Sequence, residues 1–265
     1  MMVTLDSRKY FYRYIQIAPL SLALWRGVEA AAFAEHPLNH PILDVGCGFG
    51  EFGGVFFDST VEVGIDLNQK DLLHAAKSGK YKQTAWADAR KLPFKSKQFR
   101  TVISVSTIEH ITDRHDQVFR EIYRVLKPGG RLICTMPTTH LYSALSIPTL
   151  LEFIGWKDAA HAYFRLYNKA FKHVFLPPPN VWKRLVRNAG FDIEVFEGTL
   201  SRLTLFFFEA FLPIAFISQI EKLFFGKRAA AFPSLRRRVL GPFSVFMQRD
   251  PKNLANIIIV ARKPK

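Results

Sequence analysis

Short apolar runs alternate with amphipathic segments through most of the chain. Runs rich in β-branched residues predict buried strands at 41–45, 61–66, 83–87, 100–106, 131–136, 191–196 and 256–261. Apolar residues at helical spacing predict helices at 68–78, 116–126 and 180–188, and one or two more within residues 1–39. Strands that alternate with helices are typical of an α/β fold with a parallel sheet and right-handed crossovers.

The predicted strands are interrupted by two long insertions, and these divide the chain. The resulting segments are an N-terminal helical cap (1–40), a sheet core (41–137), a first insertion (138–179), the end of the sheet (180–198 and 255–265) and a second insertion (199–254). The first insertion is apolar and aromatic. Its pattern fits both a cap over a binding site and a helical subdomain with a small core of its own.

Composition adds charge to this picture. The 265 residues carry a formal net charge of +15, and 25 of them are Phe. From Thr199 to Lys265 there are 12 Lys and Arg against 3 acids, so this stretch holds +9 of the total. The two cysteines, Cys47 and Cys134, indicate no disulfide framework and favour a reducing cytoplasm. Arg26 and Glu29 follow the apolar run at 15–25, so we expect no export signal there.

A glycine-rich loop follows the first predicted strand, in the sequence Asp44-Val-Gly46-Cys47-Gly48-Phe-Gly50. Glycines allow a tight turn and a close approach of the backbone to a ligand. Asp66 ends the second strand, where an acid accepts hydrogen bonds from ribose hydroxyls, and Asp88 follows the third, where it can accept from an adenine amino group. Ligands of open α/β sheets bind at the carboxyl ends of the strands, so these elements predict one nucleoside site.

These motifs resemble the class I S-adenosylmethionine-dependent methyltransferases, and especially the subgroup of ubiquinone and menaquinone methyltransferases. The resemblance also rests on the sequence Ile108-Glu-His-Ile111 after the fourth strand, on the turn at 126–130, and on Asn188-Ala-Gly-Phe191. It implies a Rossmann-like seven-stranded sheet, mostly parallel with an antiparallel last strand, and S-adenosyl-L-methionine as cofactor. The residues that it implies for cofactor binding are Asp44, Gly46, Cys47, Gly48, Gly50, Asp66, Leu67, Asp88, Ala89, Ser104 and Ser106.

Two details of this site remain open at the sequence level. Residues 48–53 also fit the Gly-x-Gly-x-x-Gly pattern of dinucleotide-binding proteins, but that pattern explains neither Asp44 nor the turn at 127–130. Glu51 is a candidate for the amino-acid end of the cofactor. We expect Cys47 to be a small loop residue rather than a nucleophile, and we expect no metal site.

Methyl transfer from a sulfonium is an in-line displacement, so the protein needs a general base only when the acceptor must lose a proton. The candidate bases are His110 after the fourth strand, His140 after the fifth, and His173 before the helix at 180–188. Each of them could instead order a loop. Tyr142, Tyr163 and Tyr167 are candidates for the lining of the acceptor site.

The second insertion contains an apolar run, residues 203–220, with one charged residue in eighteen. A single membrane span would separate two strands of one sheet, and a return span would carry Arg236, Arg237 and Arg238. A hairpin in the membrane interface avoids both difficulties, with Lys222, Lys227, Arg228 and the three arginines facing anionic headgroups. A Phe-rich helical subdomain or a dimer contact is the alternative.

We therefore expect a methyltransferase for a small, lipophilic or membrane-associated acceptor. Its expected location is the cytoplasm, peripheral or monotopic at the inner face of a membrane. An RNA or protein methyltransferase that uses the basic surface, and a non-catalytic cofactor-binding protein anchored to a membrane, are the alternatives. Nucleic acid is the less favoured partner, because the chain has no Asn-Pro-Pro-Tyr or Pro-Cys sequence after the fourth strand. The acceptor atom and the oligomeric state are open.

Overall fold

The computed structural model describes residues 8–215 and 233–265. The chain forms two compact units, each assembled from segments that are distant in sequence. A sheet unit comprises Pro37–His140, Tyr167–Glu197 and Asn256–Lys265. A helical unit comprises Met1–His36, Leu141–Leu166 and Gly198–Ala255. The helical unit therefore takes the N-terminal segment together with most of both insertions.

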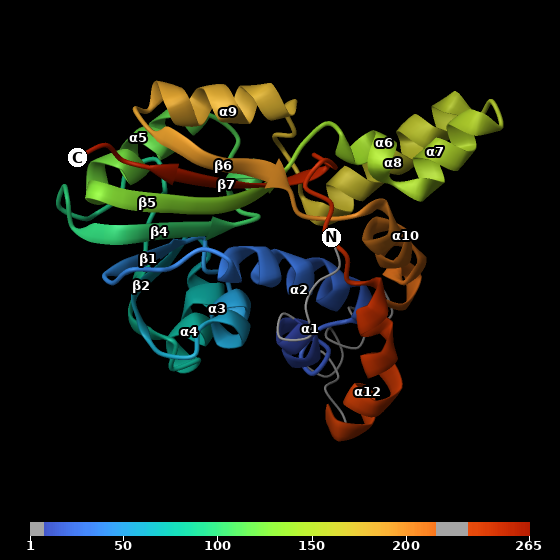
Figure 1. Cartoon of the computed structure of the whole chain (residues 1–265), viewed down its shortest axis with the longest axis horizontal. Coiled ribbons are helices and arrows are strands. Elements are labelled where there is room, and N and C mark those ends of the chain that lie inside the picture. The colour runs from blue at the N-terminus through green and yellow to red at the C-terminus, as the bar shows by residue number, and fades with distance from the viewer. Residues whose placement is uncertain (1–7, 216–232) are drawn as a thin grey trace. The chain divides into compact units, whose positions relative to one another are not determined.

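Seven strands form one sheet in the order β3-β2-β1-β4-β5-β7-β6 (Figure 1). Their bounds are β1 Ile42–Val45, β2 Val61–Asp66, β3 Tyr81–Trp86, β4 Phe99–Val105, β5 Leu126–Pro137, β6 Asp192–Gly198 and β7 Asn256–Arg262. Strands β1 to β5 pair in parallel, whereas β7 pairs with β5 antiparallel. The predicted seven-stranded, mostly parallel sheet with an antiparallel last strand is confirmed.

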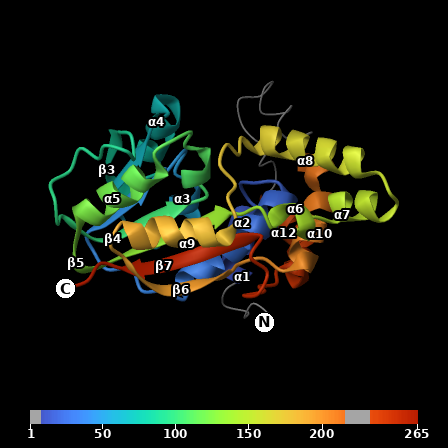
Figure 2. The ribbon, with the colours of Figure 1, turned by 90° about the horizontal axis from the view of Figure 1, so that it is seen from above.

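Helices cover both faces of this sheet. They are α3 Glu51–Phe56, α4 Gln69–Lys77, the short helix η1 Ile108–His110, α5 His115–Val125 and α9 Pro179–Asn188. Helices α5 and α9 lie side by side on one face, where the rings of Phe119 and Trp182 are 6.3 Å apart (Figures 1 and 2). All four residues of β1 are buried. Central strands covered on both faces have no polar side to alternate, which is why they appear in the sequence as continuous apolar runs.

Strand β5 begins five residues earlier than its apolar run. The sequence predicts a turn at 127–130, but the structure extends β5 back to Leu126, directly after α5. Phe99 pairs with Leu126 and Thr101 pairs with Arg131, so five residues of β5 match two of β4. Gly129, with a φ of 75°, lies inside this irregularity. The Pro-Gly-Gly segment is thus a bulge within the strand rather than a separate turn.

The helical unit is built from short helices around buried aromatic side chains. They are α1 Arg8–Tyr14, α2 Leu20–Ala34, α6 Leu141–Ala144, α7 Ser146–Phe153, the greater part of α8 Lys157–Phe171, α10 Arg202–Ala210, α12 Pro233–Leu240 and η2 Gly241–Phe246. Phe208 of α10 is fully buried, and its ring lies 4.9 Å from that of Trp25 in α2. The ring of Phe207 stacks on that of Phe246 with a centroid distance of 3.5 Å. Much of the aromatic content of the second insertion therefore forms a core of its own.

The three tandem arginines of the second insertion lie in α12, and two of them contact their own unit. The Arg236 guanidinium donates to the backbone carbonyls of Ile15 and Ala18, each at 2.8 Å. Arg237 lies over the Tyr12 ring at 5.2 Å. Lys222, Lys227 and Arg228 lie outside the described residues. Within residues 8–215 and 233–265, no helix combines the length and the hydropathy needed to cross a membrane.

Candidate active site

The glycine loop turns sharply between β1 and α3. The backbone N–H groups of Gly46 and Cys47 both donate to the Ile65 carbonyl, at 2.8 and 2.9 Å, which ties the loop to the end of β2. Gly46, Gly48 and Gly50 all have positive φ angles. A Cβ on Gly46 would lie 2.1 Å from Cγ2 of Thr107, so no larger residue fits there. The loop therefore keeps its backbone at the carboxyl edge of the sheet, with three glycines in a conformation that other residues avoid.

Asp66 is held at the end of β2 by two backbone groups of its own unit. Its Oδ2 accepts the N–H of Gly48 at 2.9 Å, and its Oδ1 accepts the N–H of Asn68 at 2.8 Å. Each carboxylate oxygen can accept a second hydrogen bond, so Asp66 can still receive the two hydroxyls of a ribose. Leu67, the next residue, is 53% exposed beside it. An apolar side chain in that position can cover one face of an adenine ring.

Asp88 follows β3, as the sequence predicts, and is paired with a neighbouring arginine. The Arg90 guanidinium donates to both carboxylate oxygens, with contacts of 2.8 to 3.1 Å, and also contacts Asp113. These hydrogen bonds from Arg90 hold the pKa of Asp88 below its ordinary value. Asp88 therefore stays ionised, and an adenine amino group would share it with Arg90. Ala89 lies between the two and is buried.

Asp44 and Cys47 lie beneath the loop rather than at its surface. Asp44 is 2% exposed, and its Oδ2 accepts the Tyr81 hydroxyl at 2.7 Å. Burial raises the pKa of Asp44 to about 7, against the lowering effect of that hydrogen bond. Burial also raises the pKa of the Cys47 thiol, which opposes the formation of a nucleophilic thiolate. Asp44 thus supports the loop through Tyr81, a contact that sequence spacing does not predict.

Ser104 in β4 and Ser106 just after it differ in role, and the sequence did not point to the threonine beside them. Ser104 is buried, and its hydroxyl donates to the Val45 carbonyl at 3.0 Å, which links β4 to β1. Ser106 has a φ of 47°, and its N–H donates to the Thr135 carbonyl. The Thr107 hydroxyl donates to the Gly46 carbonyl at 3.3 Å, so Thr107 both fills the space beside Gly46 and bonds its backbone. No sequence motif points to Thr107, so only its contact with Gly46 identifies it.

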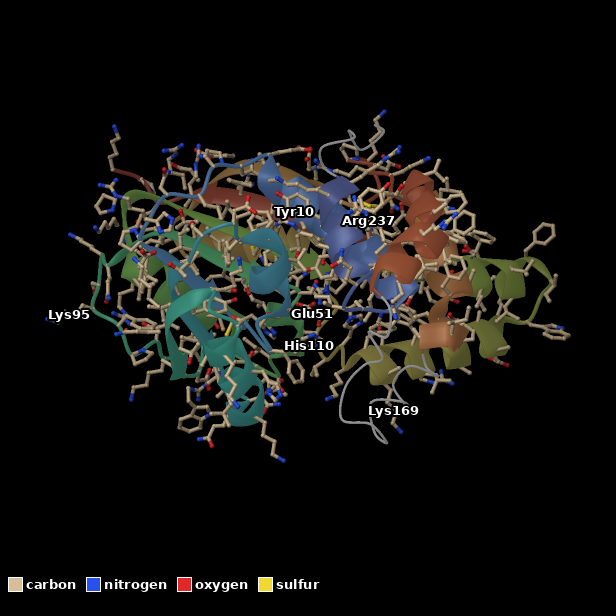
Figure 3. All side chains as sticks on the ribbon, turned by 90° about the horizontal axis from the view of Figure 1, so that it is seen from below. Tyr10, Glu51, Lys95, His110, Lys169 and Arg237 are labelled. Carbon is tan, nitrogen blue, oxygen red and sulfur yellow. The ribbon has the colours of Figure 1, made fainter. Side chains whose placement is uncertain are left out.

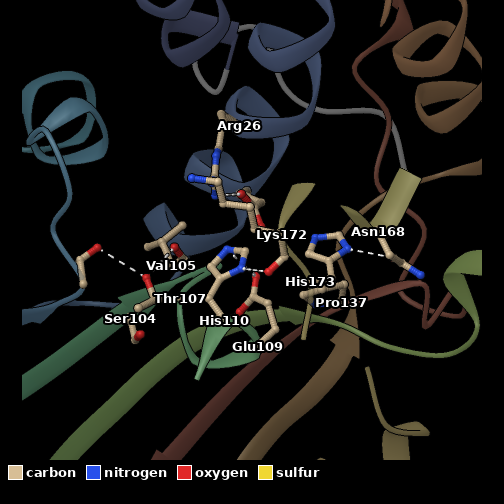
Figure 4. Close-up of polar contacts among 12 residues, drawn as sticks. Arg26, Ser104, Val105, Thr107, Glu109, His110, Pro137, Asn168, Lys172 and His173 are labelled. Atoms are coloured by element: carbon tan, nitrogen blue, oxygen red, sulfur yellow. Dashed lines mark hydrogen bonds and ion pairs between the residues drawn. The ribbon is translucent and has the colours of Figure 1, made fainter. Parts of the chain in front are cut away.

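Two of the three candidate histidines come together although 63 positions separate them in sequence. The rings of His110 and His173 stack with centroids 5.8 Å apart and planes 20° apart (Figure 4). The backbone carbonyl of Glu109 accepts the N–H groups of Val174 and Phe175, and these hydrogen bonds tie the segment after His173 to the segment that carries His110. His140 lies directly after β5, where its backbone N–H donates to the Thr138 hydroxyl at 3.1 Å. The structure thus gives His110 and His173 a shared site and places His140 on a different strand end.

Hydrogen bonds fix the tautomers of the two stacked histidines. Nδ1 of His110 lies 2.8 Å from the Lys172 carbonyl, and Nδ1 of His173 lies 3.1 Å from Oδ1 of Asn168 (Figure 4). Both partners are acceptors, so each Nδ1 carries a proton and Nε2 is the basic nitrogen of the neutral ring. Oε1 of the buried Glu109 side chain is 3.9 Å from Nε2 of His110.

The remaining predicted residues are divided between the two units. Glu51 opens α3 directly after the glycine loop (Figure 3). Tyr167 is buried in the sheet unit, where its ring contacts those of Phe171 and His173. Tyr142 and Tyr163 belong to the helical unit and donate to carboxylates there, Tyr142 to Glu152 and Tyr163 to Glu209. Of the three tyrosines, Tyr167 alone lies in the same unit as the glycine loop.

The sheet unit fits the expected cofactor on its own geometry. No atom lies within 4 Å of the position a Cβ of Gly48 would take, the Asp66 oxygens retain accepting capacity, and Leu67 offers an exposed apolar surface. All three features lie at the carboxyl edge of β1 and β2, where nucleosides bind in open sheets. Together they define a site for a nucleoside that presents a ribose to a carboxylate.

Comparisons with known proteins identify the family. Residues 43–134 match the methyltransferase domain family. The chain is 30% identical over 182 residues to ubiquinone/menaquinone biosynthesis C-methyltransferase UbiE of Desulfotalea psychrophila, covering 63% of this chain and 71% of the relative. It is 34% identical over 135 residues to tRNA (carboxymethyluridine(34)-5-O)-methyltransferase of Arabidopsis thaliana, covering 49% of this chain and 33% of that relative.

Solved structures agree on the fold. The [4+2]-cyclase SpnF has a TM-score of 0.58 and 21% identity over 90% of this chain and 81% of its own. Haemonchus contortus phosphoethanolamine N-methyltransferase 2, with S-adenosyl-L-methionine bound, has a TM-score of 0.54 and 24% identity over 98% of this chain and 57% of its own. At these identities the likeness concerns the fold, which carries cyclisation in one protein and methyl transfer in the other.

The chain belongs to the class I S-adenosylmethionine-dependent methyltransferases. Within that class it is similar to the methyltransferases of quinone biosynthesis, and its cofactor is S-adenosyl-L-methionine.

Proposed function

We propose that this methyltransferase acts on a small lipophilic acceptor at an anionic membrane surface. The observation that carries the proposal is the similarity to UbiE, which is named as a C-methyltransferase of ubiquinone and menaquinone biosynthesis. Charge supports the membrane part, because 12 Lys and Arg against 3 acids lie between Thr199 and Lys265. Basic segments with exposed apolar side chains suit an anionic lipid surface.

The bound cofactor would supply an electrophilic methyl group on a sulfonium. Asp66 would hold the ribose hydroxyls, and the Gly46–Gly50 loop would lie against the amino-acid end together with Glu51. Asp88, with Ala89 and Leu67, would bind the adenine. We assign Asp44, Cys47, Ser104 and Ser106 to support of this pocket. Asp44 accepts the Tyr81 hydroxyl, and the side chains of Cys47 and Ser104 donate to backbone carbonyls. Ser106 is held by its backbone N–H, which donates to a carbonyl of β5.

The stacked pair His110 and His173 is our candidate for proton transfer. Both rings present Nε2 as their basic nitrogen, and Oε1 of Glu109 lies 3.9 Å from Nε2 of His110. Such a pair can take a proton from a hydroxyl, an ammonium or an activated ring carbon as the methyl group arrives. His140 is the second candidate, since it follows β5 at the same edge of the sheet.

Incubation of membrane extract with the full-length protein and methyl-labelled S-adenosylmethionine tests the proposal. We expect the label in the organic phase, in a compound that heat-inactivated protein does not label. Label found only in water-soluble metabolites, protein or RNA would reject a lipophilic acceptor. Mass spectrometry of the labelled compound then identifies the acceptor atom.

A second candidate function is methylation of RNA, favoured by the similarity to the tRNA methyltransferase of Arabidopsis thaliana. The segment 89–100 carries five Lys and Arg and no acid. Lys95 within it is exposed and points away from the sheet unit (Figure 3). RNA binding through this segment would weaken steeply as salt rises. Tight, salt-dependent binding of tRNA, with label transferred to a nucleoside, would favour this function over the first.

A further inference from the structure

The turn between α7 and α8 exposes a cluster of large apolar side chains. Leu150 is 61% exposed, Phe153 87%, Ile154 49% and Trp156 64%, and we call these four residues the apolar tip. They lie within seven consecutive positions at the end of α7 and the start of the following turn. Single exposed apolar residues are ordinary on a protein surface, but such a group on one turn marks an interaction site.

The backbone of this turn is fully specified by hydrogen bonds. The N–H of Trp156 donates to the Leu151 carbonyl at 2.8 Å, and the N–H of Gly155 donates to the Glu152 carbonyl at 3.0 Å. Gly155 has a φ of 86°, and nothing lies within 4 Å of the position its Cβ would take. These are the two bonds and the left-handed glycine of a Schellman motif. The apolar side chains are therefore presented outward by a defined helix end.

The surroundings of the apolar tip favour an anionic lipid layer over a protein partner. Trp156 is followed at once by Lys157 and Asp158, and the described residues of the helical unit together carry 12 Lys and Arg against 6 Asp and Glu. Lys157 and Arg165 are exposed, and the nearby Glu152 receives the hydroxyl of Tyr142 at 2.6 Å. Tryptophan prefers the membrane–water interface, and basic residues of the same unit attract anionic headgroups.

We infer that the apolar tip, Leu150, Phe153, Ile154 and Trp156, inserts into the acyl boundary of an anionic phospholipid layer. Lys157 and Arg165 of α8 then lie at the level of the headgroups. This inference rests on the proposed membrane-associated function and gives it a specific contact surface. The surface belongs to the first insertion, whereas the sequence pattern points to the second.

Vesicle binding tests the apolar tip directly. The full-length protein is sedimented with vesicles of phosphatidylcholine and phosphatidylglycerol, and with vesicles of phosphatidylcholine alone. We expect the double variant Phe153→Ser, Trp156→Ser to bind the anionic vesicles at least about tenfold more weakly, since two apolar side chains lose their burial. Leu73→Ser, which changes a 64% exposed apolar residue of α4, is the matched control and should bind as the wild type does.

Fluorescence gives a second readout. The emission of Trp156, isolated as the difference between the wild type and Trp156→Phe, should shift to the blue on anionic vesicles and be quenched by brominated acyl chains. Calorimetric titration with S-adenosylmethionine should give equal affinity for the wild type and the tip variants, which confirms that they are folded.

Three outcomes separate the inference from the proposed function. Wild type and tip variants that bind vesicles equally, with no shift of Trp156, would overturn the inference and leave membrane association standing. If the wild type binds neither kind of vesicle, the inference and the membrane part of the proposed function are both wrong. If the wild type self-associates and the tip variants do not, the apolar tip is a contact between copies of the chain, and the inference fails in favour of that contact.

Discussion

The sheet unit and the helical unit use their apolar side chains differently. In the sheet unit, all of β1 and six of the seven residues of β7 are buried, and most predicted site residues lie at or just after strand ends. In the helical unit, Phe208 and Trp25 form a core, but Phe153 and Ile214 stay largely exposed. A sheet that binds a nucleoside needs precise backbone positions, whereas a helical surface that meets a partner needs apolar side chains in contact with solvent. From this difference we propose that cofactor chemistry belongs to the sheet unit and partner recognition to the helical unit.

The largest effect is expected at Gly46. Gly46→Ala should abolish detectable binding of S-adenosylmethionine in calorimetry, because its Cβ would overlap Thr107 and a left-handed φ costs alanine roughly 1–2 kcal/mol before that clash is counted. Gly54→Ala in α3 is the control, since no atom lies within 4 Å of its Cβ position. If both variants bind the cofactor as the wild type does, the glycine loop is not the cofactor site.

The histidine pair gives the next largest effect. His110→Gln and His173→Gln should each lower kcat by roughly 100- to 10,000-fold, a typical range for loss of a general base, with unchanged cofactor affinity. His40→Gln, at the opposite end of β1, serves as control. A loss of activity in His140→Gln alone would move the base to the end of β5.

In the helical unit, Phe208→Ala should lower the free energy of unfolding by about 3–5 kcal/mol, the usual cost of removing a buried phenyl ring. The neighbouring exposed Phe206→Ala is the control and should change stability by less than about 0.5 kcal/mol. Urea denaturation measures both. Cofactor affinity of the folded variants should stay within about twofold of wild type, and a large loss in Phe208→Ala would contradict the division of roles between the units.

Asp66→Asn should weaken cofactor binding by about 10- to 100-fold, because a hydrogen bond to a charged group contributes roughly 1.5–3 kcal/mol. Asp192→Asn, an exposed acid at the start of β6, should leave the affinity unchanged. Calorimetric titration of both variants is the measurement. Equal affinity in the two variants would show that the ribose is held elsewhere.

The smallest effect concerns Asp44 and depends on pH. Burial raises the pKa of Asp44 from 3.8 to about 7, so its contribution to stability is present below about pH 4 and is lost as the pH rises through 7. Asp44→Asn keeps an acceptor for Tyr81 but cannot ionise. It should be more stable than wild type at pH 8 by about 1–3 kcal/mol, with no difference near pH 4. If the wild type and Asp44→Asn have equal free energies of unfolding at pH 8 as well as near pH 4, this prediction is wrong.

Local patterns were sufficient for the sheet and for much of the site. The glycine loop, Asp66 and Asp88 are short motifs placed directly after strands, and parallel strands bring their carboxyl ends to one edge whatever the intervening sequence. The bulge at 127–130 was predicted as a separate turn, because local composition cannot distinguish a turn from a bulged strand whose partner accommodates it. Thr107 carries no motif, and only its contact with Gly46 identifies it.

The sequence by itself determined the class of fold and the family and pointed to a candidate nucleoside site, because each depends on residues adjacent in the chain. Only the tertiary structure decided that His110 meets His173, that Arg90 holds Asp88, and that Asp44 lies under Tyr81. It also decided that Phe208 of the Phe-rich insertion packs on Trp25 and Phe207 on Phe246, while the turn at Phe153 and Trp156 faces outward. Contacts and exposure depend on how distant segments pack, and a linear pattern of apolar residues does not specify which of them will find a partner.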